Sequence, residues 1–93
     1  MKHFVYVLIN YDGSKTYTGS TYDLERRLLE HNLGKNKSSK PYIPYEILFY
    51  EAFDSLVEAN RQEKFYKTTT GRRKLKLAVE NWNRFKLEGE SAT

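Results

Sequence analysis

The hydrophobic pattern of the chain starts with a run of six apolar residues, 4 to 9, that is rich in β-branched and aromatic side chains. Such a run is typical of a buried β-strand. The dipeptide Asp12-Gly13 follows it, and this pair is a strong short-range signal for a hairpin with a primed turn. We therefore expect residues 15 to 19 to form a second strand, antiparallel to the first.

The turn decides which side chains share a face of this hairpin. If Asp12-Gly13 supplies its two central residues, Leu8 pairs with Tyr17, and Tyr6 pairs with Gly19. Opposed residues lie on the same face, so both tyrosines then point to one side, with open space beside Tyr6 at the glycine. A three-residue loop would shift the register by one and place the two tyrosines on opposite faces.

The next stretch predicts a helix, a loop and a third strand. Thr21 is a suitable N-cap for a helix over about residues 22 to 33, and Gly34 is placed to end it. Residues 34 to 42, rich in Lys, Ser, Asn and Gly, predict a flexible loop. Residues 45 to 51 have the composition of a strand that completes the sheet.

Two further helices are predicted in the second half. Ser55 opens a capping box and starts a helix that reaches about Thr68. Its inward stripe is expected to hold Leu56, Ala59, Asn60, Glu63 and Lys67. From Gly71, apolar residues at helical spacing predict a third helix, with Leu75, Ala78, Val79, Trp82 and Phe85 on it.

These elements predict an α/β fold of the α+β kind. A small, three-stranded, mainly antiparallel sheet is flanked by three helices, in the order β-β-α-β-α-α. A chain of 93 residues is long enough for one domain, which we place at residues 1–88, and we expect a frayed tail over 89–93.

Composition narrows the setting of this domain. The chain has no cysteine, which excludes disulfides and thiolate metal sites and favours a reducing compartment. The apolar run near the start is too short for a signal peptide, and no stretch approaches the roughly 20 apolar residues that cross a bilayer. We therefore expect a soluble, cytoplasmic protein without a membrane partner.

The distribution of charge is more informative than the net charge of +4. Seven of the sixteen basic residues lie within residues 61–76, where Glu63 is the only acid: Arg61, Lys64, Lys67, Arg72, Arg73, Lys74 and Lys76. A second group, Lys35, Lys37 and Lys40, lies in the loop after the first predicted helix. Such patches are typical of proteins that bind a phosphate backbone, although a solvated helix face has the same composition.

Helical spacing identifies the arginine of the first helix that faces inward. At 100° per residue, Leu24, Arg27, Leu28 and His31 fall on one face, whereas Arg26 points almost the opposite way. Arg27 and His31 are therefore the polar residues expected to face the sheet from this helix.

These segments resemble the GIY-YIG nuclease superfamily, and specifically its small stand-alone bacterial members. Phe4-Val5-Tyr6 stands for the first tripeptide and Tyr17-Thr18-Gly19 for the second, and the likeness continues through the helix with Arg27 to Glu63. Phenylalanine replaces the first glycine of the motif and threonine replaces the central isoleucine. The likeness therefore rests on the two tyrosines, Gly19, Arg27 and Glu63.

Each task of phosphodiester hydrolysis has a candidate residue. Tyr6 is the first choice to orient or deprotonate water, and Tyr17 is expected to be its hydrogen-bonding neighbour. Arg27 offers a charged fork of donors that matches a phosphate. Glu63, the one isolated inward acid, would hold a single hydrated Mg²⁺ or Mn²⁺. His31 would donate a proton or a hydrogen bond.

The resemblance implies similar roles, with the metal on Glu63 and with both tyrosines and Arg27 at the scissile phosphate. It does not decide which tyrosine takes the proton. The residues expected to bind the nucleic-acid backbone are Lys15, Lys35, Lys37, Lys40, Arg61, Lys64, Lys67, Arg72 and Arg73.

Taken singly, the same residues have ordinary structural explanations. Strand tyrosines usually belong to the core, and His31 would then be a packing residue. Arg27 would pair with Asp23, and Glu63 with Lys67, as common helix ion pairs.

We therefore predict a metal-dependent DNA endonuclease, structure-selective in repair or recombination, that hydrolyses phosphodiester bonds and is directed by a targeting protein partner. A non-catalytic nucleic-acid-binding module and a nuclease-derived protein-interaction domain are the alternatives. No element of the sequence predicts the reading of a base sequence.

Overall fold

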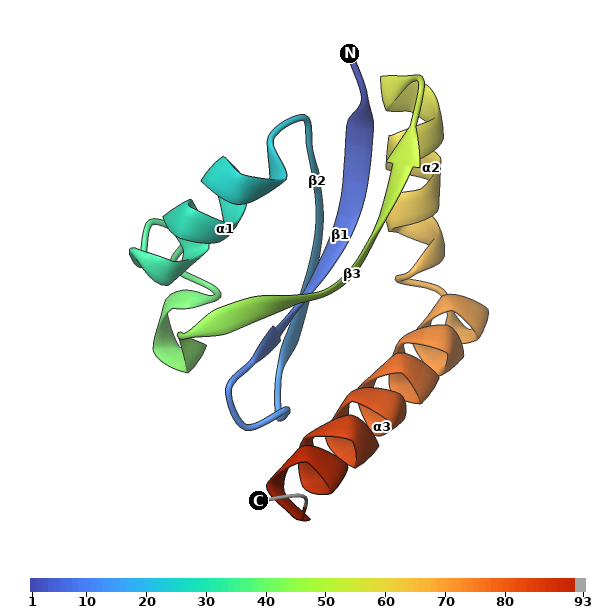
Figure 1. The fold of residues 1–93 in the computed structure, drawn as a ribbon. Helices are drawn as coiled ribbons and strands as arrows, with labels where there is room; N and C mark the ends of the chain where they lie inside the picture. Colours follow the sequence, from blue (N-terminus) through green and yellow to red (C-terminus); the bar gives the residue numbers. More distant parts are fainter. Residues whose placement is uncertain (92–93) are drawn as a thin grey trace.

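The computed structural model describes residues 1–91 and folds them into a three-stranded sheet with three α-helices (Figure 1). The elements follow the predicted order β-β-α-β-α-α and confirm the α+β fold. They are β1 (His3–Asn10), β2 (Thr16–Thr21), α1 (Leu24–Asn32), a short 3-10 helix (Lys40–Tyr42), β3 (Tyr45–Phe53), α2 (Leu56–Phe65) and α3 (Thr69–Ser91).

The sheet has β1 at its centre, antiparallel to β2 on one side and β3 on the other. Leu8 pairs with Tyr17 and Tyr6 pairs with Gly19, which confirms the predicted register. The turn itself differs from the prediction. Asn10 N–H donates to the Lys15 carbonyl, so four residues, 11 to 14, form the loop in place of two. A loop that grows by two residues leaves each side chain on the same face, so the tyrosines stay together.

The two faces of β1 are both buried, because helices cover the sheet on each side. Val5 packs with Ala59 and Tyr66 under α2 and α3. Tyr6, its neighbour in sequence, points the other way and packs with Leu8 and with Leu24 of α1. The sheet therefore separates an α1 layer from a layer made by α2 and α3.

The helix caps agree with the sequence at one helix and correct it at another. Ser55 caps α2 by accepting a hydrogen bond from Glu58 N–H, as predicted. In α1 the N-cap is Asp23, which accepts from Arg26 N–H, and Thr21 instead accepts from Asp23 N–H. Aspartate caps a helix as well as threonine does. Because the cap is Asp23 rather than Thr21, α1 begins at Leu24, two residues later than predicted.

The inward face of α2 is rotated from the predicted stripe. Ala59 is buried as expected, whereas four predicted members of the stripe are more open: Leu56, Asn60 and Lys67 are exposed and Glu63 is half-buried. The buried positions include Tyr66, whose ring packs against Phe49 and Phe65. One large aromatic ring at the end of α2 buries more apolar surface than Leu56 would, and it sets the orientation of the helix.

A tight corner joins α2 to α3. α2 ends at Phe65 and α3 begins at Thr69, before the predicted start at Gly71. A Cβ at residue 71 would overlap the backbone of Phe65 and Tyr66, so the close approach of the two helices requires glycine there.

The far end of α3 is longer than predicted. The helix continues through residues 89 to 91, where we expected a frayed tail, and residues 92 and 93 of that tail lie outside the described residues. Trp82, midway along α3, donates to Glu46 of β3 at 2.9 Å and ties this helix to the sheet. In the part of the chain that the structure describes, no helix is both long enough and apolar enough to cross a membrane.

Candidate active site on the α1 face of the sheet

Tyr6 is the centre of a buried polar cluster between β1 and α1. Its hydroxyl lies 3.1 Å from Arg27 Nε and 3.2 Å from His31 Nε2. Tyr6 and His31 are 2% and 0% exposed, so water does not compete for these contacts. The predicted inward face of α1 therefore does bring Arg27 and His31 onto the hairpin.

The donors and acceptors of this cluster fix the direction of its hydrogen bonds. Arg27 Nε can only donate, so the Tyr6 oxygen accepts from it. In the His31 tautomer that carries its proton on Nδ1, the Tyr6 O–H donates to His31 Nε2. His31 Nδ1 then carries the proton and donates to Ser39 Oγ at 2.8 Å. The Ser39 hydroxyl in turn donates to the Asn36 carbonyl at 3.4 Å. The result is a one-way chain from the arginine to the loop after α1.

The pKa values agree with this arrangement. Burial, together with the charge of Arg27, lowers the pKa of His31, so its imidazole is neutral near pH 7 and can accept a proton at Nε2. Burial also raises the pKa of Tyr6, and the hydrogen bond from Arg27 offsets that rise only in part. Tyr6 is therefore a protonated phenol in the free protein.

Tyr17 lies beside this chain rather than within it. Its ring packs against His31 with centroids 4.5 Å apart. Its hydroxyl accepts from Asn36 Nδ2 at 3.1 Å, which corrects the prediction that Tyr17 hydrogen-bonds Tyr6. The two tyrosines share a face, but the hydroxyl of Tyr6 is taken up by Arg27 and His31.

Gly19 makes room for the Tyr6 hydroxyl. A Cβ at residue 19 would overlap that hydroxyl, so the predicted open space beside Tyr6 is occupied by the end of the tyrosine ring. Any side chain at this position of β2 would push the Tyr6 hydroxyl away from Arg27.

Arg27 forms an ion pair with Glu30 rather than with Asp23, the partner considered from the sequence. Its Nη1 lies 3.3 Å from Glu30 Oε1, and Asp23 is instead used as the cap of α1. The hydrogen bond to Tyr6, ahead of the contact with Glu30, raises the pKa of Arg27. About a third of the Arg27 side chain (31%) is exposed, which leaves guanidinium N–H groups open to a ligand.

Glu63 stands apart from this chain, on α2 in the opposite layer. Its carboxylate lies 3.6 Å from Lys67 Nζ, so the helix ion pair considered as an alternative is present. The Glu63 charge still acts on the cluster, because it adds to the effect of burial in raising the pKa of Tyr6. A quarter of the side chain (25%) is exposed.

A metal at Glu63 would have few protein ligands. In residues 1–91 no group of three or more His, Cys, Asp or Glu side chains is close enough to hold an ion. One partly exposed carboxylate does fit a hydrated Mg²⁺, which keeps most of its waters and takes further ligands from substrate phosphates. A single carboxylate does not fit a metal ion that takes most of its ligands from the protein.

The basic residues predicted to bind nucleic acid do not form one surface. Lys67 and Arg72 line a cleft against the hairpin loop, whereas Arg61 and Lys64 lie on a separate part of α2. Lys15 lies 5.1 Å from the centre of the Tyr42 ring. Four other cations of the predicted set are exposed: Lys35, Lys37, Lys40 and Arg73.

The loop after α1 supplies two residues of the candidate site that the sequence did not predict. Asn36 and Ser39 hold Tyr17 and His31, and Ser39 is 1% exposed. Within the segment predicted as a flexible loop, the Tyr45 hydroxyl donates to the Ser39 carbonyl at 3.1 Å, and Lys40–Tyr42 form a short 3-10 helix. The available signal was the density of Asn and Ser residues that can bond side chains nearby.

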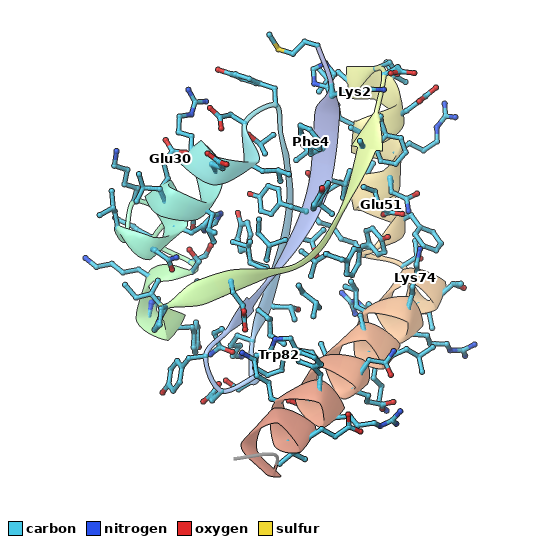
Figure 2. The ribbon with its side chains drawn as sticks, viewed as in Figure 1. Lys2, Phe4, Glu30, Glu51, Lys74 and Trp82 are labelled. Carbon is cyan, nitrogen blue, oxygen red and sulfur yellow. The ribbon has the colours of Figure 1, made fainter. Side chains whose placement is uncertain are left out.

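A second missed group lies on the opposite face, where Tyr66, Gln62 and Glu51 share hydrogen bonds. Lys74 of α3 points toward Glu51 of β3, and the two are 3.7 Å apart (Figure 2). This group joins β3, α2 and α3 and stabilises the second layer.

Comparisons with known proteins place this geometry in a family. The profile described as the GIY-YIG catalytic domain matches residues 2–76. A UPF0213 protein of Staphylococcus saprophyticus is 39% identical over 80 residues, which cover 85% of this chain and 96% of that protein. A UPF0213 protein of the strain DSM 16790 of Haloquadratum walsbyi is 38% identical over 79 residues, which cover 84% of this chain and 88% of that protein.

A solved structure is similar as well. The solution NMR structure of a UPF0213 protein from Bacillus halodurans matches with a TM-score of 0.50 and 37% identity, covering 83% of this chain and 82% of that chain. The similarity therefore extends over most of the sequence and over the arrangement of the elements.

Proposed function

The chain belongs to the GIY-YIG family of nuclease-type catalytic domains, and from that premise we propose that it is a metal-dependent DNA endonuclease. The reaction we propose is direct attack of water on a phosphodiester bond. The observation that carries the proposal is the buried Tyr6 hydroxyl, which accepts from Arg27 Nε and lies within hydrogen-bond distance of His31 Nε2.

This chain supports an assignment of Tyr6 as the general base. A phenol with a raised pKa is a poor base until it loses its proton, and His31 Nε2 is a neutral acceptor 3.2 Å away. Both pKa shifts oppose transfer of the phenolic proton to His31, so a phenolate would form only where the charge of Arg27 and of a metal ion on the substrate phosphate favours it. A water admitted beside Tyr6 with the substrate would then give a proton to the phenolate as the water oxygen bonds to phosphorus and the leaving oxygen departs.

Arg27 supports a second role in the same reaction. Its exposed guanidinium N–H groups, now directed at Glu30, would turn to a phosphate oxygen of the substrate, since a phosphate takes the same fork of donors as a carboxylate. Negative charge grows on the phosphoryl oxygens in the transition state, and a fixed cation there lowers the barrier. Tyr17, packed on His31, would keep the imidazole in place.

Glu63 is the residue that would hold the metal, as one Mg²⁺ or Mn²⁺ ion with water and substrate phosphate as its other ligands. Such an ion, when bound, neutralises charge on the phosphate and on the leaving oxygen. Glu63 must leave its ion pair with Lys67 to take this role. That step is inexpensive, because a partly exposed helix pair contributes only about 0.3–0.5 kcal/mol.

The non-catalytic binding module is the second candidate, since the exposed cations on α2 and α3 would bind a phosphate backbone equally well without cleavage.

The test incubates the protein with nicked, flapped, branched, single-stranded and plain duplex DNA, with Mg²⁺, Mn²⁺ or EDTA. Cleavage that needs the metal supports the nuclease, and a preference for flapped or branched substrates supports a role in repair or recombination. Salt-sensitive binding without cleavage favours the module, and the absence of both favours the protein-interaction domain. Cleavage that begins only when a targeting partner is added supports a nuclease directed by that partner.

A further inference from the structure

A second basic site lies on the face of the sheet opposite the tyrosine cluster. A cleft of about 440 Å³ opens between the hairpin loop and the start of α3. Ser14 and Thr16 line it from the hairpin, and Leu75 lies between the cations of α3. Three cations face it, namely Lys67, Arg72 and Lys76. No carboxylate lines this cleft within residues 1–91.

Two of these cations have no compensating acid. In the described part of the chain, Lys67 pairs with Glu63, whereas neither Arg72 nor Lys76 takes part in an ion pair. Lys74, between them in sequence, points away to Glu51 (Figure 2). Arg72 and Lys76 are four residues apart on a helix, a spacing at which like charges repel and destabilise the helix. An anion between them would remove that repulsion.

The walls of the cleft are held in place by contacts outside it. The hairpin loop packs at Gly13 against Trp82 of α3, whose indole is fixed by Glu46. Ser14 is held by Asn10 and Asp12. The hairpin loop and the helix that line the cleft are therefore held against each other by contacts outside it.

A phosphate in this cleft is a different one from the phosphate beside Tyr6. Tyr66, which lines the cleft, belongs to the core cluster of Val5, and Val5 and Tyr6 point to opposite faces of β1. The ligand that neutralises paired Lys and Arg side chains is a phosphate-class anion, and contacts of this kind position a backbone without touching the reacting bond.

We infer that the cleft formed by the hairpin loop and α3 is a second phosphate-binding site, which holds a backbone phosphate of the nucleic acid other than the phosphate beside Tyr6. The inference rests on the proposed function for the identity of the ligand. Arg72 and Lys76 are its binding residues, and Lys2 and Arg84, equally basic and exposed, lie outside it.

The test compares two full-length variants that lose the same charge. The cleft variant carries Arg72→Gln and Lys76→Gln, and the matched control carries Lys2→Gln and Arg84→Gln, two exposed cations outside the predicted nucleic-acid-binding set. Affinity for a fluorescent 20-base-pair DNA duplex is measured by anisotropy in EDTA, from about 50 to 200 mM KCl. All four residues are exposed, so both variants are expected to fold, and circular dichroism checks this.

We expect the cleft variant to bind about tenfold more weakly at the lowest salt and to lose about one unit of slope in log K against log salt, as for one lost phosphate contact. The control should change less than about threefold. Equal losses in the two variants would overturn the inference, because the cations would then act only through net charge.

A second arm separates the two sources of phosphate. Inorganic phosphate is titrated into both variants and the wild type while the amide signals of Gly13, Ser14 and Thr16 are followed by NMR. If inorganic phosphate binds the cleft but the cleft variant keeps wild-type affinity for DNA, the nucleic-acid assignment is overturned. The binding measurements are made in EDTA, where metal-dependent cleavage does not occur. If the wild type fails to cleave DNA in the presence of metal, the proposed function fails, but the binding result still stands.

Discussion

At the scale of the residue, Gly19 and the Tyr6 hydroxyl compete for the same space. Gly19→Ala places a methyl group on the hydroxyl, and the buried cluster has no room to give way. We expect about 1–3 kcal/mol loss in the free energy of unfolding, as for other overpacked cores. Chemical denaturation measures it. Gly89→Ala is the matched control, since nothing lies near it on exposed α3, and it should stabilise by up to about 1 kcal/mol.

His31 gives the protein a pH-dependent stability. Its pKa is lowered in the fold by burial and by Arg27, so unfolding raises its proton affinity. The stabilisation from the neutral imidazole is complete above the unfolded pKa of about 6.5 and is lost as pH falls through that value toward the folded one. Denaturation from pH 8 to 5 should show this fall. It should disappear in His31→Gln and persist in His3→Gln, which changes the other histidine.

The substitution Glu63→Gln tests metal binding separately from the stability of α2. Because Glu63 already pairs with Lys67, we expect Glu63→Gln to lower the free energy of unfolding by no more than about 0.5 kcal/mol. The same change should abolish metal-dependent cleavage. Thermal melting and cleavage of duplex DNA in Mg²⁺ measure the two effects. A folded Glu63→Gln protein that cleaves at the wild-type rate would remove the metal assignment.

At the scale of the element, the sequence predicted what depends on local periodicity. Alternation along the hairpin placed both tyrosines on one face, and the helical spacing of α1 turned Arg27 and His31 toward them. The exact turn was wrong, but its error of two residues preserved the register. The residues around His31 were missed because the loop that carries Ser39 is ordered by contacts with Tyr45, which no local pattern encodes.

The loop after α1 gives a further prediction, at Ser39. Ser39→Ala removes the acceptor of His31 Nδ1–H and leaves a buried donor without a partner, which costs about 1–3 kcal/mol. It also releases the tautomer that lets Nε2 accept from Tyr6, so cleavage should slow even at temperatures where the variant is folded. Ser38→Ala, the exposed neighbour, should change neither quantity. Denaturation and single-turnover cleavage rates compare the two.

At the scale of the whole molecule, the sheet divides the chemistry between two layers. The α1 layer holds the tyrosine cluster, and the layer of α2 and α3 holds Glu63 and the cleft cations. The order of the elements was predictable from hydrophobic pattern alone. The rotation of α2 was not predictable, because it depends on the burial of Tyr66. Tyr66 lies just past the last residue of α2, and its ring packs against Phe65 and against Phe49 of β3, which is distant in sequence.

The central claim is that the buried Tyr6 hydroxyl takes part in the hydrolysis of DNA. The measurement that tests it most directly is the single-turnover cleavage rate in Mg²⁺ of Tyr6→Phe against Tyr11→Phe, an exposed tyrosine of the hairpin loop. We predict a loss of about 100-fold or more for Tyr6→Phe, as for removal of a general base, and no more than about a twofold change for Tyr11→Phe. Cleavage by folded Tyr6→Phe at the wild-type rate would contradict it.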